Sequence, residues 1–204
     1  MVYTLVFGVI LKARWGFSGG TANYALMLFA GLIVFNAFAE CLVKAPSLIR
    51  ANPNFVKKIV FPLELIGIGV WLIGYSILFG APKPTVILFP LILACFFPVL
   101  LGVGWLFSAV GIIVRDIDQV TSLISHALLF LTPIFYTVDA IPAAFQALMN
   151  VNPLTFIVEQ LRLVLFGELP SMMGLALYLI FSSLFAWLSL LVFNRLRSGF
   201  ADMV

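Results

Sequence analysis

Long uncharged runs constrain this chain more than any other feature of its sequence. Among the stretches without Asp, Glu, Lys or Arg, five are candidate membrane spans: 15–39, 65–82, 84–114, 119–138 and 169–194. All but the second reach the ~20 residues that a helix needs to cross a ~30 Å hydrocarbon core, and the second extends through Glu64 to Pro62. The sequence therefore predicts five membrane-spanning helices, at about 24–43, 62–80, 85–113, 119–138 and 173–193.

The composition excludes most classes of soluble protein. Hydrophobic residues make up 64% of the 204 residues and charged residues only 9%, against about 25% charged in ordinary soluble domains. Too few polar side chains remain to cover the surface of a soluble enzyme, and a disordered chain is excluded as well. The net charge is only +3, so the composition does not indicate a basic surface that would bind nucleic acid. Cys41 and Cys95 lie inside apolar runs, so we interpret them as core residues and not as a disulfide or metal site.

The N-terminal segment is apolar but short. Residues 1–11 would reach only ~16 Å as a helix, which cannot cross a membrane alone. We interpret them as the outer half of a truncated sixth span. A signal peptide is the competing interpretation, but it would carry basic residues before its apolar run, whereas Lys12 and Arg14 follow it.

Basic residues in the connecting segments predict the orientation in the membrane. If the spans alternate in direction, seven basic residues lie on one side and four on the other. Because the side richer in Lys and Arg is normally cytoplasmic, we expect the C-terminus and the loop 44–61 inside the cell. The seven are Lys44, Arg50, Lys57, Lys58, Arg115, Arg195 and Arg197, and the four are Lys12, Arg14, Lys83 and Arg162.

The loop 44–61 contains a predicted short amphipathic helix. Asn52 is suited to cap this helix, Pro53 to open it and Pro62 to end it. Apolar side chains fall on one face, and polar ones, Lys58 among them, on the other. Two interpretations stay open: an interfacial helix whose lysines reach lipid phosphates, or a docking element for a cytoplasmic partner.

The run 84–114 is longer than a membrane requires. As a straight helix it would reach ~46 Å, so we expect it to tilt or to kink at Pro90 and Pro98. A tight, charged cytoplasmic turn follows, in which Asp116 or Asp118 can cap the next span.

Residues 139–170 should lie outside the cell but are too apolar for a free loop. They predict two short helices, at about 140–149 and 153–166, with Asn152 as the N-cap of the second and Gly167 as its stop signal. Both helices are too short to cross a membrane. The economical interpretation is a pair of re-entrant half-depth helices beside a pore or vestibule. A helical hairpin lying flat on the membrane is the alternative.

Few ionisable residues lie within the predicted spans. Glu40 and Glu64 stand near span ends, and only His126 lies inside one, where a lone histidine is more often a helix–helix hydrogen-bond partner than a proton relay. Glu159 and Arg162, in the second short outer helix, stand at i, i+3 and can pair. No catalytic cluster, metal-ligand spacing or phosphate-binding loop occurs in the sequence. We therefore expect neither an enzyme nor a cofactor, and any energy must come from a partner protein.

Aromatic residues make up 15% of the chain. Each one can be core or lipid-facing, but together the mid-span aromatics can build a pathway with flat, weakly polar walls. Such walls suit sugar rings, which stack on π faces and slide without strong fixed bonds. The candidate pathway residues are Phe35, Phe38, Trp71, Tyr75, Phe130, Phe135 and Tyr136.

Four short motifs, in order along the chain, resemble those of type-2 ABC exporter permeases for polysaccharides. ANPNFVKKIVFP at 51–62 looks like the first cytoplasmic loop of that family, and VRDID at 114–118 like its second cytoplasmic turn. TPIFY at 132–136, with Ile141-Pro142 and NPLT at 152–155, resembles its outer re-entrant region. GFAD at 199–202 resembles the C-terminal ending of O-antigen and capsule exporters.

The resemblance implies an all-α integral membrane protein with one permease domain over 1–204 and six spans, the first of them truncated. It also implies a homodimer in the cytoplasmic (inner) membrane that binds two cytoplasmic ABC ATPase subunits. The substrate would be a polysaccharide, of O-antigen, capsule or teichoic acid type, on a lipid carrier such as undecaprenyl diphosphate.

The same resemblance assigns roles to particular residues. The loop helix would be the coupling helix, and the outer short helices would gate the mouth of the channel. The residues implied at the ATPase contact are Asn52, Pro53, Asn54, Phe55, Lys57, Lys58, Phe61, Arg115 and Asp116, and those at the outer gate are Asn152, Pro153, Glu159 and Arg162.

Other functions remain alternatives. An ABC permease for drugs or other hydrophobic molecules would carry the same coupling elements. An ion-coupled secondary carrier would use Glu40, Glu64 and His126, and would transport without an ATPase. A membrane-embedded enzyme would need a catalytic cluster that the sequence lacks.

Overall fold

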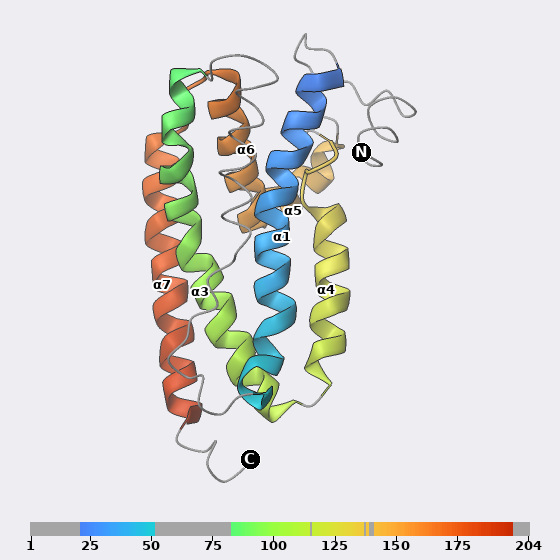
Figure 1. The fold of residues 1–204 in the computed structure, drawn as a ribbon, viewed down its shortest axis with the longest axis vertical. Coiled ribbons are helices and arrows are strands. Elements are labelled where there is room, and N and C mark those ends of the chain that lie inside the picture. The colour runs from blue at the N-terminus through green and yellow to red at the C-terminus, as the bar shows by residue number, and fades with distance from the viewer. Residues whose placement is uncertain (1–20, 52–82, 115, 137, 139–140, 198–204) are drawn as a thin grey trace. The chain divides into compact units, whose positions relative to one another are not determined.

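The computed structural model describes residues 21–51, 83–114, 116–136, 138 and 141–197. Within these ranges the chain forms helices and turns and no strand, which confirms the all-α expectation. Figure 1 shows the elements, which are α1 (Thr21–Ala51), η3 (Pro84–Leu88), α3 (Phe89–Ile113), α4 (Ile117–Leu131), α5 (Ala143–Val151), α6 (Pro153–Phe166) and α7 (Met172–Arg197). The spans predicted at 1–11 and 62–80 lie outside the described residues.

Three helical segments of the described chain are long and apolar enough to cross a membrane. They are Met27–Ser47, Pro84–Ile113 and Met172–Leu196, with mean hydropathies of 1.7, 2.8 and 2.2. They correspond to the spans predicted at 24–43, 85–113 and 173–193. The chain is therefore an integral membrane protein whose helices match three of the predicted spans.

The predicted span 119–138 is wrong at its C-terminal end. Helix α4 has 15 residues and ends at Leu131, so it measures only about 22 Å. The cause is Pro133, because the residue before a proline is pushed out of helical geometry. Thr132 N still donates to Leu128 O at 2.8 Å, but Ile134 N already turns back to Thr132 O at 2.7 Å.

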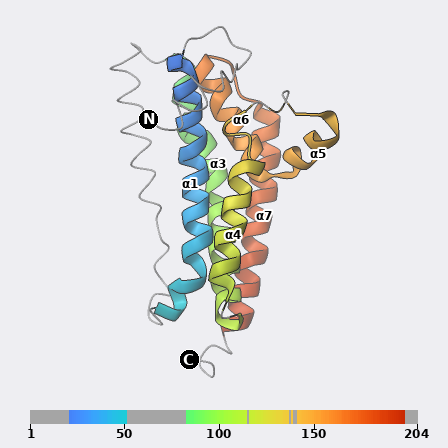
Figure 2. The same ribbon diagram turned by 90° about the vertical axis from the view of Figure 1, so that its right-hand side faces the viewer.

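Helix α1 continues beyond its predicted end at residue 43 and reaches Ala51, so the first part of the loop predicted at 44–61 is helical. Pro46 lies inside the helix, and Figure 2 shows the C-terminal end of α1 turning away from the helix axis. Hydroxyl groups supply donors beside this bend: Ser47 Oγ donates to Lys44 O at 3.0 Å, and Ser108 Oγ to Ala45 O at 2.9 Å. The predicted helix from Asn52 onward lies outside the described residues.

The predicted kink at Pro90 is a junction between two helix types. Pro84–Leu88 forms a 3-10 helix, and the α-helix begins at Phe89, so that Pro90 falls in its first turn. A proline is tolerated there because the backbone N–H groups of the first turn have no intrahelical partner. Pro98 does lie inside α3.

The described residues belong to two compact units. The first holds 21–35 of α1, η3, residues 128–136, α5 and α6. Helix α6 is its core and buries nine side chains, of which Leu154, Ile157, Leu161 and Val164 are buried completely.

The second unit holds 36–51 of α1, residues 90–127 and α7. In it α3 and α7 run side by side, the green and red ribbons of Figure 1. A Cβ atom added to Gly102 would meet Phe185 Cδ1 at 2.5 Å, and Ser182 Oγ donates to Cys95 O at 3.4 Å.

Candidate functional site

Helix α6 begins and ends where its sequence signals predict. Asn152 Oδ1 accepts from Leu154 N at 3.0 Å, and Pro153 occupies the first helical turn, where no backbone N–H is needed. At the other end Gly167 adopts φ 87°, with Gly167 N bonded to Val164 O at 3.2 Å and Glu168 N to Leu163 O at 2.9 Å. These two bonds form a Schellman motif, which requires the left-handed conformation that glycine allows.

The same Asn152 side chain links α6 to the turn that follows α4. Its Nδ2 donates to Thr132 Oγ1 at 3.0 Å and lies 3.5 Å from Leu131 O. Thr132 is completely buried. One side chain therefore caps a helix with its oxygen and bonds the end of α4 with its nitrogen.

We expect Asn152→Ala to lower the free energy of unfolding by about 2 kcal/mol, because it removes the cap and the link together. Asn152→Ser keeps a capping oxygen but cannot reach Thr132, so its loss should be about half as large. Thermal unfolding of the detergent-solubilised protein measures both variants. Equal losses for the two variants would show that the contact with Thr132 contributes nothing.

Helix α5 precedes α6 directly and was predicted at 140–149. It forms over Ala143–Val151, after Pro142, and Gln146 Nε2 donates to Ile141 O at 2.9 Å. Figure 2 shows α5 and α6 as two separate short helices joined at a sharp angle. With 9 and 14 residues they measure about 13 and 21 Å, so neither is long enough to cross a membrane.

Arg162 holds the turn after α4 against α6. The side chain is only 7% exposed, and Nη2 donates to Ile134 O at 3.0 Å. Gly31 of α1 lies beside this contact: a Cβ there would be in ordinary contact with Nη2 at 3.5 Å and in tighter contact with Ile134 Cγ2 at 3.3 Å. A backbone carbonyl in a water-poor turn needs such a donor. Glu159, half-buried on the same helix, stays a predicted partner of Arg162.

We expect Arg162→Ala to lower the free energy of unfolding by about 2 kcal/mol, through the lost hydrogen bond and the cavity left by the buried stem. Arg162→Lys keeps the charge and most of the stem but not the planar fork, so it should fall between wild type and Arg162→Ala. Thermal unfolding again measures the series. An Arg162→Ala variant as stable as wild type contradicts the anchoring role.

The candidate pathway aromatics differ in how far their side chains are exposed. Phe35, Phe38 and Phe135 are at most 7% exposed, whereas Phe130 is 65% exposed. Tyr136 is half-buried; its hydroxyl donates to Phe130 O and lies 3.9 Å from Met149 Sδ. The rings of Phe130 and Phe135 lie 6.5 Å apart and 37° tilted. Among the described candidates, Phe130 is thus the most exposed, while Trp71 and Tyr75 lie outside the described residues.

The candidate ATPase contacts fall mostly outside the described residues. This holds for the whole set from Asn52 to Phe61 and for Arg115. Asp116 is described and exposed in the turn before α4.

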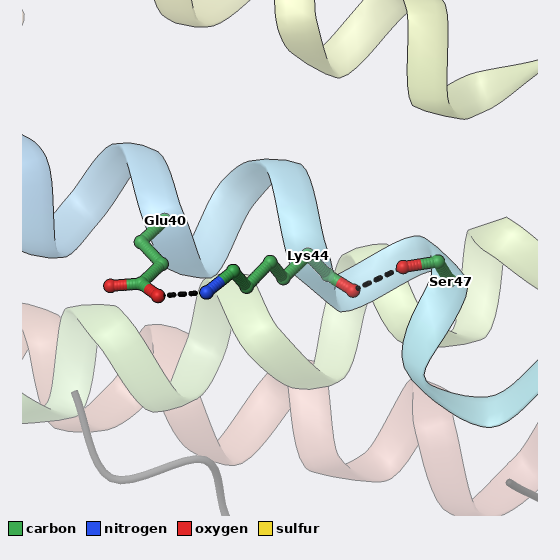
Figure 3. A network of polar contacts seen from close by, with 3 residues as sticks. All are labelled: Glu40, Lys44 and Ser47. Carbon is green, nitrogen blue, oxygen red and sulfur yellow. Dashed lines mark hydrogen bonds and ion pairs between the residues drawn. The ribbon is translucent and has the colours of Figure 1, made fainter. Parts of the chain in front are cut away.

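Glu40 is paired within α1. Figure 3 shows the Glu40 carboxylate and the Lys44 ammonium group in an ion pair one helical turn apart, with the backbone carbonyl of Lys44 accepting from Ser47. The two charged side chains are 26% and 61% exposed, so this is a surface pair of the i, i+4 type. Such a pair stabilises the helix locally, and a carboxylate already paired in this way is poorly suited to bind a coupling ion.

No group of three or more His, Cys, Asp or Glu side chains that could hold a metal ion occurs in the described ranges.

A family model described as ABC-2 type transporter matches residues 62–166 of the chain. The chain belongs to the ABC-2 type transporter family. The match runs from before η3 to the last residue of α6, so it includes Asn152, Arg162 and the turn that they hold. As an ABC-2 family member the chain is a transport subunit.

The relatives of this ABC-2 family member carry a specific name. The chain is 24% and 25% identical to two forms of the O-antigen export system permease protein RfbA of Klebsiella pneumoniae, with all of the chain and 82% of each relative aligned. It is 20% identical to the protein of the same name of Myxococcus xanthus, with all of the chain and 83% of the relative aligned.

Two features of this ABC-2 family member escaped the sequence analysis. One is the close approach of α1 and α3, where a Cβ on Gly111 would meet Pro46 O at 2.5 Å. The other is Thr155, which is 2% exposed and whose Oγ1 has no hydrogen-bond partner within the described chain. A glycine inside an apolar helix was the only available signal for the first, and nothing in the sequence marked the second.

We expect Thr155→Val to raise the free energy of unfolding by about 1 kcal/mol, because it replaces an unsatisfied buried hydroxyl by a methyl group of the same shape. Most substitutions in the core of α6 should act in the opposite direction. The thermal midpoint of the variant tests this, and a lower midpoint than wild type would mean that the hydroxyl has a partner in the assembled protein.

Proposed function

We propose that this chain is the permease subunit of an ATP-driven exporter that moves a lipid-linked polysaccharide, of O-antigen or capsule type, across the cytoplasmic membrane. The observation that carries the proposal is the full-length similarity to O-antigen export permeases in a chain of the ABC-2 family. The paired short helices α5 and α6, each too short to span, fit a gate at the outer mouth of a channel.

Two copies of the chain and two cytoplasmic ABC ATPase subunits make up the proposed exporter. The segment 52–61 that follows α1 is its coupling element, with Lys57 and Lys58 at or near the ATPase. Closure of the ATPase pair on ATP would push this element and rock the two permease subunits. Helix α1 leads directly into the coupling element, and α3 lies against the end of α1 at Pro46, so movement there reaches two spans. The C-terminus lies on the cytoplasmic side.

The aromatic side chains supply the passage for the glycan in this proposal. Sugar rings stack on aromatic faces, and the exposed Phe130 is suited to such contacts. ATP hydrolysis changes the shape of the passage in this proposal. Strong fixed bonds between the passage and the glycan would prevent the glycan from sliding.

Deletion of the gene in its own host tests the proposal. Surface polysaccharide, measured by immunoblot and lectin binding on intact cells, should disappear, while lipid-linked polysaccharide accumulates inside. Wild-type chain supplied on a plasmid should restore export. Undiminished surface polysaccharide in the deletion strain, with altered tolerance to hydrophobic drugs, would instead identify a drug exporter.

A further inference from the structure

Helix α4 divides its surface into three faces. Thr121 and Ser125 are buried against the rest of the chain. The exposed remainder has an apolar edge and a polar edge, which follow from the 100° rotation between successive residues. Val120, Ile124 and Ala127 form the apolar edge, and Gln119, the half-buried Ser122 and His126, spaced i, i+3, i+7, form the polar edge. The exposed side chains of Leu123 and Phe130 lie between the two edges.

His126 is the decisive residue of the polar edge, because it is exposed well inside an apolar helix. It lies nine residues into α4, about 14 Å from the start of the helix. An ionisable side chain at such depth is costly against lipid and normally faces a water-filled cavity or the interior of a bundle. The side chains of the neighbouring apolar edge can face lipid without this cost.

The hydrogen bond of His126 fixes which ring nitrogen is available. Nδ1 lies 2.7 Å from Ser122 O, one turn back on the same helix. A carbonyl oxygen only accepts, so Nδ1 carries the proton and Nε2 of the neutral ring is an acceptor. This bond is made within α4, so the predicted bond to a neighbouring helix concerns Nε2 alone and stays a prediction. Nε2 therefore points an acceptor away from its own helix.

We propose that Gln119, Ser122 and His126 line the wet passage of the exporter and hydrogen-bond the hydroxyl groups of the polysaccharide, while Val120, Ile124 and Ala127 face lipid. Sugar hydroxyls donate and accept, and the amide of Gln119 and Nε2 of His126 match both roles. The identity of the cargo rests on the proposed function; the contact with water does not.

The first experiment measures water access in cells that carry the complete exporter. His126→Cys and Ala127→Cys are treated separately with a membrane-impermeant maleimide, and the labelled sites are read by peptide mass spectrometry. The native Cys41 and Cys95 serve as internal references. We expect Cys at position 126 to be labelled and Cys at 127 to stay protected, because a maleimide needs an aqueous path to the thiol.

Two outcomes of this experiment overturn the proposal. Protection of both positions would place the polar edge in lipid or under another helix. Oxidative cross-linking of His126→Cys between two copies of the chain, without maleimide labelling, would place it in a contact between copies.

The second experiment measures export. His126→Leu should cut the rate at which polysaccharide appears on the surface by about tenfold, which corresponds to one lost hydrogen bond of ordinary strength. His126→Gln keeps a polar group and should retain most of the rate. Leucine is well accepted by membrane helices, so a fall in rate at normal protein level reflects the passage and not folding. A wild-type rate for His126→Leu overturns the contact with the cargo.

The two proposals fail in distinguishable ways. Surface polysaccharide that survives deletion of the gene removes the proposed function and leaves the water access of position 126 to be read independently. Loss of polysaccharide on deletion, with position 126 protected from maleimide, keeps the proposed function and removes the polar edge from the passage.

Discussion

Gly111→Ala is expected to lower the free energy of unfolding by about 3 kcal/mol or more and to abolish export. The new Cβ would lie 2.5 Å from Pro46 O and 2.6 Å from Pro46 Cα, which is far inside van der Waals contact. Both are backbone atoms of a bent helix, so they cannot rotate away as a side chain would. The helices would have to separate, and this would stretch the nearby hydrogen bond from Ser108 to Ala45 O.

Gly104→Ala is the matched control on the same helix. A Cβ at this position meets nothing within 4 Å, so the same substitution should be neutral or stabilise α3 by up to about 1 kcal/mol. Fluorescence-detected size-exclusion chromatography after heating compares the two variants. Equal thermal midpoints for Gly111→Ala and Gly104→Ala would contradict the close approach of α1 and α3.

The largest functional loss is expected from reversing the charge of the proposed coupling element. Lys57→Glu together with Lys58→Glu should weaken binding of the ATPase subunit by about 100-fold, because like charges placed across an interface cost several kcal/mol. Surface polysaccharide should disappear as a result. Co-purification of the tagged permease with its ATPase measures the binding, and an intact complex with normal export would remove the docking role from these lysines.

Lys44→Glu controls for the change of charge itself. Lys44 is 61% exposed and lies on the side expected to be cytoplasmic, and within the described residues its ion pair is with Glu40 on the same helix. Its reversal costs a few tenths of a kcal/mol through repulsion within α1. Both the complex and export should therefore survive.

Local signals in the sequence were sufficient for α6. Its range, 153–166, follows from an N-cap, a proline and a glycine, each of which acts on the backbone within one turn. The ends of the other helices depend on whether an apolar run or a proline within it decides where the helix stops, and the sequence alone does not show which one prevails. Apolarity continues past Leu131 and predicts a longer α4, yet Pro133 ends the helix, and α1 passes through Pro46 although a proline normally ends a helix.

The contacts of the candidate site are the part that sequence reasoning could not supply. Arg162 was predicted to belong to an outer gate, but the sequence did not indicate its bond to Ile134 O, which joins residues 28 positions apart in the chain. Nothing in the spacing of residues indicates which carbonyl a buried guanidinium will reach. The same holds for Gly111, whose close contact is with Pro46, a residue more than sixty positions earlier in the chain.

The shortness of α4 has a consequence for the lipids around it. At about 22 Å, α4 is too short by itself for a hydrocarbon layer of ~30 Å, and thinning of the bilayer at that place is one way in which such a mismatch is relieved. Acyl chains next to α4 are then compressed, and the two headgroup layers approach each other locally. A cargo that is anchored to a lipid would have a shorter distance to carry its charged headgroup through oil there than anywhere else along the protein.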